Sequence, residues 1–441
     1  MNKKIIYWII TAFLLVGGWL LLENLVGNSS LHAQQEVTIH ITEGVPLVPV
    51  AIPEFTVKTN SPAAQTIKSE IYDTLCNDLQ YSRVFKLIPK DYYSYIPKFT
   101  PDNIRFKDWA SIQANILIVG EIDAPTENRI VFSMNVYDVQ SEKFIFSRNF
   151  GGEKEFTRLI AHRGSDEMMK YFGEKPIFTT KLVFVSSRDG NNEVYVMDYD
   201  GARQKRITFN NFLDMLPSWS SDNEKILYTS YKQGTPDLLM YNLFTGKTET
   251  LASRGTNYSA DWSPEADRIV YTSTRSGNAE IYVRDMKTGK EKQLTFGKVI
   301  INSTPSWSPN GQEIVFTSQR SGTPQIYLMD AEGTNVRRIT LQGGYHDSPV
   351  WSPDGTRIAY VSRIESRFDI YVFTIKDNTI YKLTESAGRN ENPTWSPDGR
   401  HIIFASNRTG AYHLYSVDYD GTNLKQLTFH GENKMPKWQK K

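Results

Sequence analysis

The chain has little cysteine and histidine, the residues on which disulfide frameworks and many metal sites depend. Of its 441 residues one is a cysteine, Cys76, and seven are histidines. A single cysteine cannot form an intramolecular disulfide and cannot supply a zinc site made of cysteines. The histidines show no metal-ligand spacing; they are His32, His40, His162, His346, His401, His413 and His430. The sequence therefore predicts no metal centre and no cofactor.

An excess of charge of one sign is also lacking. The formal net charge is +1, whereas proteins that bind nucleic acid or anionic membranes carry a basic excess. We therefore expect no nucleic-acid partner. The chain also lacks the Gly-x-Ser-x-Gly turn of many hydrolases and the GxxxxGK loop that binds phosphates. These absences weigh against an enzyme, and we predict no catalytic residues.

Long apolar runs are absent except at the N-terminus. There, Lys3 and Lys4 precede an uncharged, mostly apolar run over residues 5–22, and a short polar stretch then ends at Ala33. This order predicts that residues 1–33 are a cleaved export signal. The alternative is an uncleaved anchor, because the run just reaches the length that spans a bilayer. Either way, the remaining chain is expected outside the cytoplasm.

A repeat with a period in the forties fills the second half of the chain. Its marker residues are six tryptophans, namely Trp219, Trp262, Trp307, Trp351, Trp395 and Trp438. The first five are each followed by turn residues and by short β-branched strands, and this period is typical of four-stranded propeller blades. The sequence therefore predicts an all-β six-bladed propeller over residues 176–441. We expect the tryptophans to pack between blades.

Two partial repeats lie at the ends of this region. Residues 181–208 lack a preceding Trp-Ser segment, while Trp438 has no second strand after it. The two parts should complete one blade, with residues 435–439 as its innermost strand. Such a pairing closes the ring and hides sheet edges that would otherwise be exposed.

Residues 34–175 carry no repeat and predict a small α/β domain in front of the propeller. The apolar periodicity predicts strands over 37–42, 48–55, 84–88, 116–122, 130–138 and 144–150, and helices over 62–79, 107–113 and 154–171. On the last helix, His162 and Asp166 are one turn apart and can pair. With no third partner in view, this pair is weak evidence for acid–base chemistry.

A set of polar residues recurs five positions before each tryptophan. They are Asp214, Asn257, Asn302, His346, Asn390 and Asn433. We expect them in the loop that enters each innermost strand, circling one mouth of the channel as a partner-binding site. The residues that follow them extend this surface outward; among them are Tyr258, Ser303, Asp347 and Glu391. The alternative is that Asn and Asp recur there because the turn requires them.

Motifs outside the repeats, taken with the repeats, resemble one known family. They are Glu36-Val37-x-Ile39 with Ile41 and Gly44, the run ending at Phe55, residues 115–120, Arg158-x-x-Ala161-His162 with Asp166, and residues 178–184. Together with the WSPDG-type turns, they resemble the TolB family of the Gram-negative Tol-Pal system over nearly the whole mature chain. Thr38 departs from the family, in which a basic residue is common there.

This resemblance implies a periplasmic protein-binding scaffold that is monomeric on its own. It implies that the propeller binds a Pal-type lipoprotein and that the N-terminal strand, with Glu36, Val37, Ile39, Ile41 and Gly44, is presented to a TolA-type protein. The system supports outer-membrane invagination during cell division and outer-membrane integrity. The alternatives are a propeller-based lyase or hydrolase and a propeller that binds a small ligand.

Overall fold

The computed structural model describes residues 46–440, except 59–60, 98, 100–102, 127, 365 and 386. The described residues fall within one compact unit. The predicted export signal, its cleavage site at Ala33 and the N-terminal strand at 37–42 lie outside them. No helix in the described part of the chain is long and apolar enough to span a membrane.

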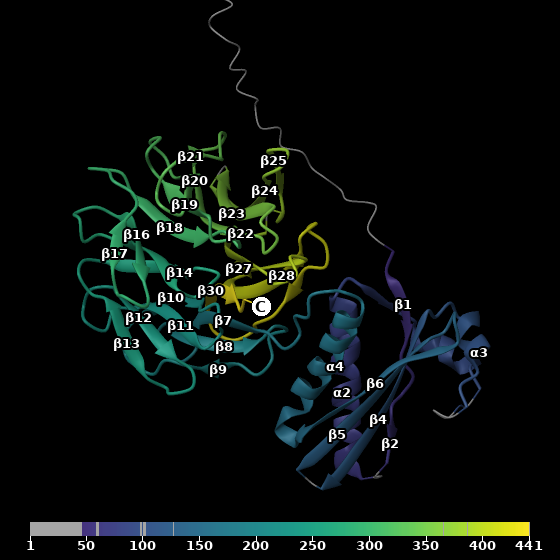
Figure 1. Ribbon diagram of the computed structural model, residues 1–441. Helices are drawn as coiled ribbons and strands as arrows, with labels where there is room; N and C mark the ends of the chain where they lie inside the picture. The colour runs from purple at the N-terminus through teal and green to yellow at the C-terminus, as the bar shows by residue number, and fades with distance from the viewer. Residues whose placement is uncertain are drawn as a thin grey trace, which may run out of the picture. The chain divides into compact units, whose positions relative to one another are not determined.

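The first part of the chain folds into a mixed sheet with helices (Figure 1). Its strands are β1 (Val48–Ala51), β2 (Thr56–Val57), β3 (Phe85–Leu87), β4 (Ile116–Thr126), β5 (Arg129–Asp138) and β6 (Lys143–Glu153). Its helices are α2 (Pro62–Tyr81), α3 (Phe106–Ser111) and α4 (Thr157–Tyr171), with 3₁₀ turns η1 (Lys90–Tyr95) and η2 (Lys154–Phe156). The sheet order is β3-β1-β4-β5-β6, with β2 paired to β4. The predicted α/β domain is confirmed.

One predicted strand is divided. Residues 48–55 were expected as a single strand, but β1 ends at Ala51 and β2 begins at Thr56. Pro53 has no N–H to donate to a neighbouring strand, so it interrupts the ladder. The residues between the two strands are nevertheless core residues, because Ile52 and Phe55 are buried.

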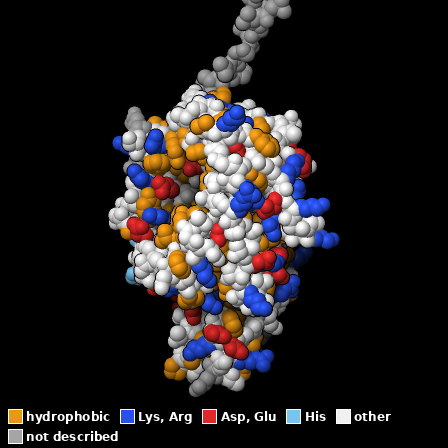
Figure 2. Space-filling model, turned by 90° about the vertical axis from the view of Figure 1, so that its left-hand side faces the viewer, with side chains coloured by type: hydrophobic (Ala, Val, Ile, Leu, Met, Phe, Trp, Pro, Cys, Tyr) orange, Lys and Arg blue, Asp and Glu red, His pale blue; other side chains and the backbone are white. Residues whose placement is uncertain are grey.

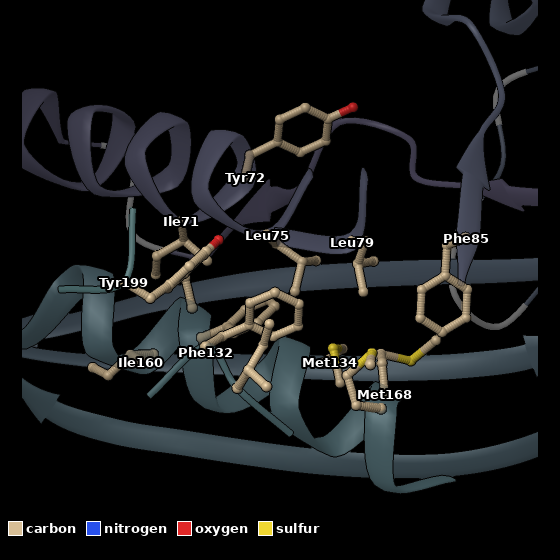
Figure 3. Close-up of a cluster of buried hydrophobic side chains, with 14 of the residues drawn as sticks. Ile71, Tyr72, Leu75, Leu79, Phe85, Phe132, Met134, Ile160, Met168 and Tyr199 are labelled. Carbon is tan, nitrogen blue, oxygen red and sulfur yellow. The ribbon is translucent and has the colours of Figure 1, made fainter. Parts of the chain in front are cut away.

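The hydrophobic core of this domain forms between α2, α4 and the sheet. Ser61 caps α2 by accepting a hydrogen bond from the amide of Ala64 (3.1 Å), and Pro62 occupies the first turn. The residues spaced along one face of α2 are Ile67, Ile71, Leu75 and Leu79, and all are buried. Figure 3 shows several of them facing Phe132, Met134 and Met168, with Tyr199 of the propeller beside Ile71.

The remaining chain forms six four-stranded antiparallel sheets, as predicted. Five are built from consecutive strands: β10 (Asp214–Trp219), β11 (Lys225–Ser230), β12 (Asp237–Asn242), β13 (Thr248–Ala252); β14 (Asn257–Trp262), β15 (Arg268–Ser273), β16 (Glu280–Asp285), β17 (Glu291–Gln293); β18 (Asn302–Trp307), β19 (Glu313–Ser318), β20 (Gln325–Asp330), β21 (Arg337–Arg338); β22 (His346–Trp351), β23 (Arg357–Ile364), β24 (Arg367–Thr374), β25 (Thr379–Lys382); and β26 (Asn390–Trp395), β27 (His401–Thr409), β28 (Ala411–Asp418), β29 (Lys425–Gln426).

The sixth sheet joins the two ends of the propeller sequence. Its order is β30 (Asn433–Trp438), β7 (Lys181–Ser186), β8 (Glu193–Asp198) and β9 (Lys205–Arg206). Asn433 pairs with Ser186, and Trp438 pairs with Leu182. The predicted closing strand is therefore confirmed.

The marker tryptophans pack between adjacent blades. Trp262, for example, lies in one cluster with Leu227 and Leu238 of the preceding blade and Ile269 of its own. All six are no more than 7% exposed. Their indole rings therefore fill the wedge between neighbouring sheets, as expected.

The predicted pair between His162 and Asp166 is wrong. His162 Nδ1 instead lies 2.8 Å from the carboxylate of Asp78 on α2, and Tyr199 of the propeller donates to the same carboxylate at 2.6 Å. Asp166 accepts hydrogen bonds from the Phe178 amide (2.9 Å) and from Thr179 Oγ1 (2.6 Å). Both residues thus join segments distant from α4, which i,i+4 spacing alone does not reveal.

A second group of contacts joins the two domains. The ring of Tyr81, at the end of α2, stacks on His401 with centroids 4.0 Å apart, and its hydroxyl lies 2.7 Å from Ser416 Oγ. Arg83 forms an ion pair with Asp418 at 2.9 Å. Together with Tyr199, these residues tie α2 to the closing blade and to the blade before it.

Replacing Trp438 with alanine should destabilise the protein strongly. The change removes a large buried side chain from the closing strand, and such losses cost about 3–5 kcal/mol. Urea unfolding followed by circular dichroism measures the change in the free energy of unfolding. Phe244→Ala is the control, because Phe244 is 79% exposed. Equal stability of the two variants would contradict this account of ring closure.

Candidate functional site

The six innermost strands enclose a channel with two distinct mouths. They are β10, β14, β18, β22, β26 and β30, and residues from all six line the narrow part of the channel. Each strand begins at one of the predicted polar residues and ends at a tryptophan. We call the first end the polar mouth and the second the tryptophan mouth.

The six polar residues do not lie where the sequence predicted. Each is the first residue of its innermost strand rather than part of the preceding loop. Their side chains are almost fully buried, with His346 the most exposed at 4%. They lie at the same level of all six blades, but they do not form an accessible ring around the mouth. The prediction fails because the first residue of each innermost strand already pairs with a residue near the end of the second strand, so it belongs to the sheet and not to the loop.

These buried side chains link neighbouring strands and blades. Ser318 Oγ donates to Asn302 Oδ1 across the strand pair at 2.7 Å. On its other side, Asn302 Nδ2 donates to Glu280 of the preceding blade at 2.8 Å. Asn390 donates in the same way to Asp369 at 2.8 Å. Buried polar groups need such partners, so these residues serve the structure of the ring.

The recurring arginines complete this network. In four blades the arginine hydrogen-bonds the serine two positions earlier and stacks over two aromatic rings; they are Arg188, Arg275, Arg320 and Arg408. Three of them also donate to an asparagine at the start of an innermost strand, as Arg408 does to Asn390 at 2.9 Å. These contacts give the arginines a structural role, and Arg275 also forms an ion pair with Glu291.

The second residues of the innermost strands lie at the polar mouth and are accessible. Tyr258, Ser303, Asp347 and Glu391 are each partly exposed. Asp347 accepts hydrogen bonds from Thr304 Oγ1 (3.0 Å) of the preceding blade and from the Tyr345 hydroxyl (3.1 Å). Burial, followed by the charge of Asp347, raises the pKa of Tyr345, so its hydroxyl stays protonated.

The next residue in every innermost strand distorts the backbone. Each has a positive φ between 49° and 56°, and none is glycine; they are Leu216, Ser259, Thr304, Ser348, Asn392 and Met435. A register shift in the strand pair accompanies each of them. Such bulges at the rim of a barrel or next to a site redirect the side chains that follow.

Exposed apolar side chains lie in loops on the face of the polar mouth, and the sequence analysis missed them. They lie in four of the loops that lead from an outermost strand to the next innermost strand: Phe209, Phe212, Leu213, Phe296, Val299, Ile301, Leu341 and Phe429. Phe209, Phe296 and Val299 are 74%, 76% and 88% exposed. The recurrence of Thr-Phe after an outer strand, as at 208–209, 295–296 and 428–429, was the available signal.

One group of described residues has the donor atoms for a metal ion, but its charges are already neutralised. Ligand atoms of His162, Asp198 and Asp200 lie within 4.8 Å of one another. Lys181 and Arg203 pair with Asp198, and Arg158 pairs with Asp200. With a cation opposite each carboxylate, the group is a junction between domains and not a site prepared for another cation.

The family models match both parts of the chain. The "TolB beta propeller domain" covers residues 168–441, and the "TolB amino-terminal domain" covers residues 37–145. The chain belongs to the TolB family.

Two curated relatives agree with this TolB assignment, and one solved structure shows the same fold. "Tol-Pal system protein TolB" of Desulfosudis oleivorans is 31% identical over 48% of this chain and 49% of its own length. The protein of the same name from Dinoroseobacter shibae is 34% identical over 49% of each chain. The aligned segments thus span about half the length of these relatives. The crystal structure of TolB from Acinetobacter baumannii superposes with a TM-score of 0.76 and 24% identity over 90% of this chain and 98% of that one, which shows a shared fold.

In this TolB-family propeller, replacing Asp214 with asparagine should stabilise the fold. Asp214 occupies the place of Asn302 and Asn390, whose amides donate to an acid of the preceding blade. Burial, with a contribution from the charge of Glu193, raises the pKa of Asp214. The Asp214→Asn variant should donate to Glu193 instead of repelling it.

We expect Asp214→Asn to raise the free energy of unfolding at pH 7 by about 1 kcal/mol. An aspartate with a raised folded-state pKa destabilises the fold progressively as pH rises from its unfolded value, about 3.9, through its folded value. The gain should therefore fade as pH falls toward 4. Urea titrations at several pH values measure it, and a gain that grows on acidification would contradict the assignment.

Proposed function

We propose that this chain is a periplasmic, non-catalytic scaffold of a Tol-Pal system. In this proposal the polar mouth of the propeller binds a Pal-type lipoprotein, and the N-terminal segment binds a TolA-type protein. By linking the two, the scaffold supports outer-membrane invagination during cell division and outer-membrane integrity. Membership of the TolB family supports the assignment to a Tol-Pal system. The exposed surface of the polar mouth supports the choice of that face for binding the lipoprotein.

The observation that carries the proposal is the set of exposed apolar side chains on the face of the polar mouth. Large apolar groups exposed together on one face are typical of protein-interaction sites, and aromatic anchors beside polar groups supply much of the binding energy. The loops that hold Phe209 and Phe296 rest on blades fixed by buried hydrogen bonds, so they are suited to present such anchors without reordering.

The charge distribution also favours a protein partner. Figure 2 shows one side of the molecule, on which lysines and arginines are interspersed with acidic and hydrophobic side chains. Mixed charge of this kind does not supply the continuous basic surface that a nucleic-acid backbone requires. It suits a protein surface, where local complementarity decides specificity.

Export of the chain is part of the same proposal. The order of Lys3 and Lys4, the apolar run over 5–22 and the small residues up to Ala33 predicts delivery across the inner membrane. The Tol-Pal relatives support a periplasmic location. Cleavage at Ala33 remains the favoured outcome, with the uncleaved anchor as its alternative.

Replacing Phe209 and Phe296 together with serine should weaken binding to a Pal-type lipoprotein domain. Each change removes an exposed aromatic anchor, and a combined loss near 1.4 kcal/mol corresponds to about tenfold in Kd. Isothermal titration calorimetry with the soluble domain of the cognate lipoprotein measures the change.

The matched control is Phe244→Ser. Phe244 is 79% exposed, but it lies in the turn between β12 and β13, on the side of the tryptophan mouth. The Phe244→Ser variant should bind the lipoprotein with the same Kd as the parent. If both the double variant and the control keep the Kd of the parent, the binding face is elsewhere.

Replacing Val37 and Ile39 together with aspartate should abolish capture by the cognate TolA-type domain. The alternating segment from Glu36 to Gly44 is proposed to add as a strand to the partner's sheet, which buries its apolar face. Thr38→Asp with His40→Asp is the control, since it changes the opposite face of the same strand. Pull-down of the purified variants distinguishes them. Equal loss for both pairs, or for neither, would count against strand addition.

A further inference from the structure

The tryptophan mouth contains a cavity that the proposed function does not use. Its volume is about 330 Å³, within the usual range of small-ligand sites. Five of the marker tryptophans line it, namely Trp219, Trp307, Trp351, Trp395 and Trp438. Prolines of the following turns, such as Pro309 and Pro353, also face it. The wall of this cavity is therefore largely apolar and rigid.

The residue before each tryptophan also lines the cavity, as do serines of the following turns such as Ser308 and Ser352. The six residues before the tryptophans are Ser218, Asp261, Ser306, Val350, Thr394 and Lys437. Only two of the six are charged, Asp261 and Lys437, and two further lysines, Lys175 and Lys440, line the cavity from outside the innermost strands. Lys437 also lines the narrow part of the channel, so its side chain lies where the cavity and the channel meet.

The C-terminal residues neutralise the acid. Lys440 lies beyond β30 and reaches across the mouth, where its ammonium group donates to Asp261 Oδ1 (3.3 Å) and to the carbonyl of Trp262 (2.8 Å). Asn223 holds the Lys440 carbonyl at 2.7 Å. Ser306 Oγ also donates to Asp261, at 3.1 Å. Burial raises the pKa of Asp261, but Lys440 and Lys437 outweigh it and keep the carboxylate ionised.

Lys437 is left without an equivalent partner. Among the described residues, no carboxylate lies within ion-pair distance of its ammonium group and no side-chain hydrogen bond holds it. Burial lowers its pKa, while Asp261 raises it and Lys440 lowers it further. One carboxylate thus faces two ammonium groups. A cation in such surroundings is stabilised by an anion that enters the cavity.

We propose that this cavity binds a small monocarboxylate with an apolar body. The carboxylate pairs with Lys437, and the apolar body lies against the tryptophans and prolines of the wall. Asp261 disfavours a ligand with more than one negative charge, because its own carboxylate lies nearby. This site is separate from the polar mouth, so it goes beyond the proposed function and does not depend on a lipoprotein partner.

Benzoate and benzamide test the proposal, because they share shape and differ in charge. Isothermal titration calorimetry of the full mature chain at pH 7 should show benzoate bound about tenfold more tightly than benzamide, as expected for one partly buried charge pair. In Lys437→Met this preference should fall to about twofold or less, while benzamide binding is kept. Lys437→Arg should restore the preference.

Lys434→Met is the matched control. Lys434 lies on the same strand at the polar mouth, where it pairs with Glu432 at 3.1 Å. It should keep the preference for benzoate, and thermal unfolding should show that all variants are folded. Absence of benzoate binding in the parent, equal affinity for benzoate and benzamide, or an unchanged preference in Lys437→Met would each overturn the proposal. If the Phe209/Phe296 variant loses lipoprotein binding but still binds benzoate, the defect is confined to the polar mouth and leaves this proposal standing.

Discussion

The antiparallel pairing of β30 with β7 is the constraint on which the rest of the propeller depends. It is the one pairing within a blade that joins the beginning and the end of the repeat region, from Leu182 to Trp438. Without it, one blade has no innermost strand and two sheet edges are exposed. The same strand carries Lys437 into the channel, and the residues after it reach across the tryptophan mouth. Closure of the ring and construction of the cavity are therefore one event.

The two mouths present different surfaces. At the polar mouth, buried amides such as Asn302 and Asn390 join their blades to the preceding ones, and the accessible groups are the following residues and the apolar loops outside them. At the tryptophan mouth, Lys440 and Asp261 close part of the opening from within the chain itself. The first arrangement presents a broad surface suited to a protein. The second encloses a small volume suited to a small molecule.

The sequence predicts the architecture well because repetition averages out local ambiguity. Six tryptophans at nearly constant spacing identify the blades, and the partial repeat at residues 181–208 identifies the closing strand. The site is predicted less well, since a period shows which positions are equivalent but not which way a side chain faces. Asn302 was expected at the surface and is buried, and the contact of His162 with Asp78 spans 84 residues, beyond any helical spacing. Phe209 is exposed although phenylalanine usually lies in the core, so its residue type alone does not identify it as part of a surface.

The same closure governs the order in which the chain acquires its structure. Gln439 accepts a hydrogen bond from the amide of Lys181, a partner 258 residues earlier. Pairings of such long sequence separation form slowly, because the loop between them must be ordered first. A chain that emerges from its N-terminus can fold the α/β domain and the intermediate blades, but the first blade stays incomplete until the last residues are free. The open ring is then the state most exposed to misassembly, because its unpaired strand edges are available to other chains.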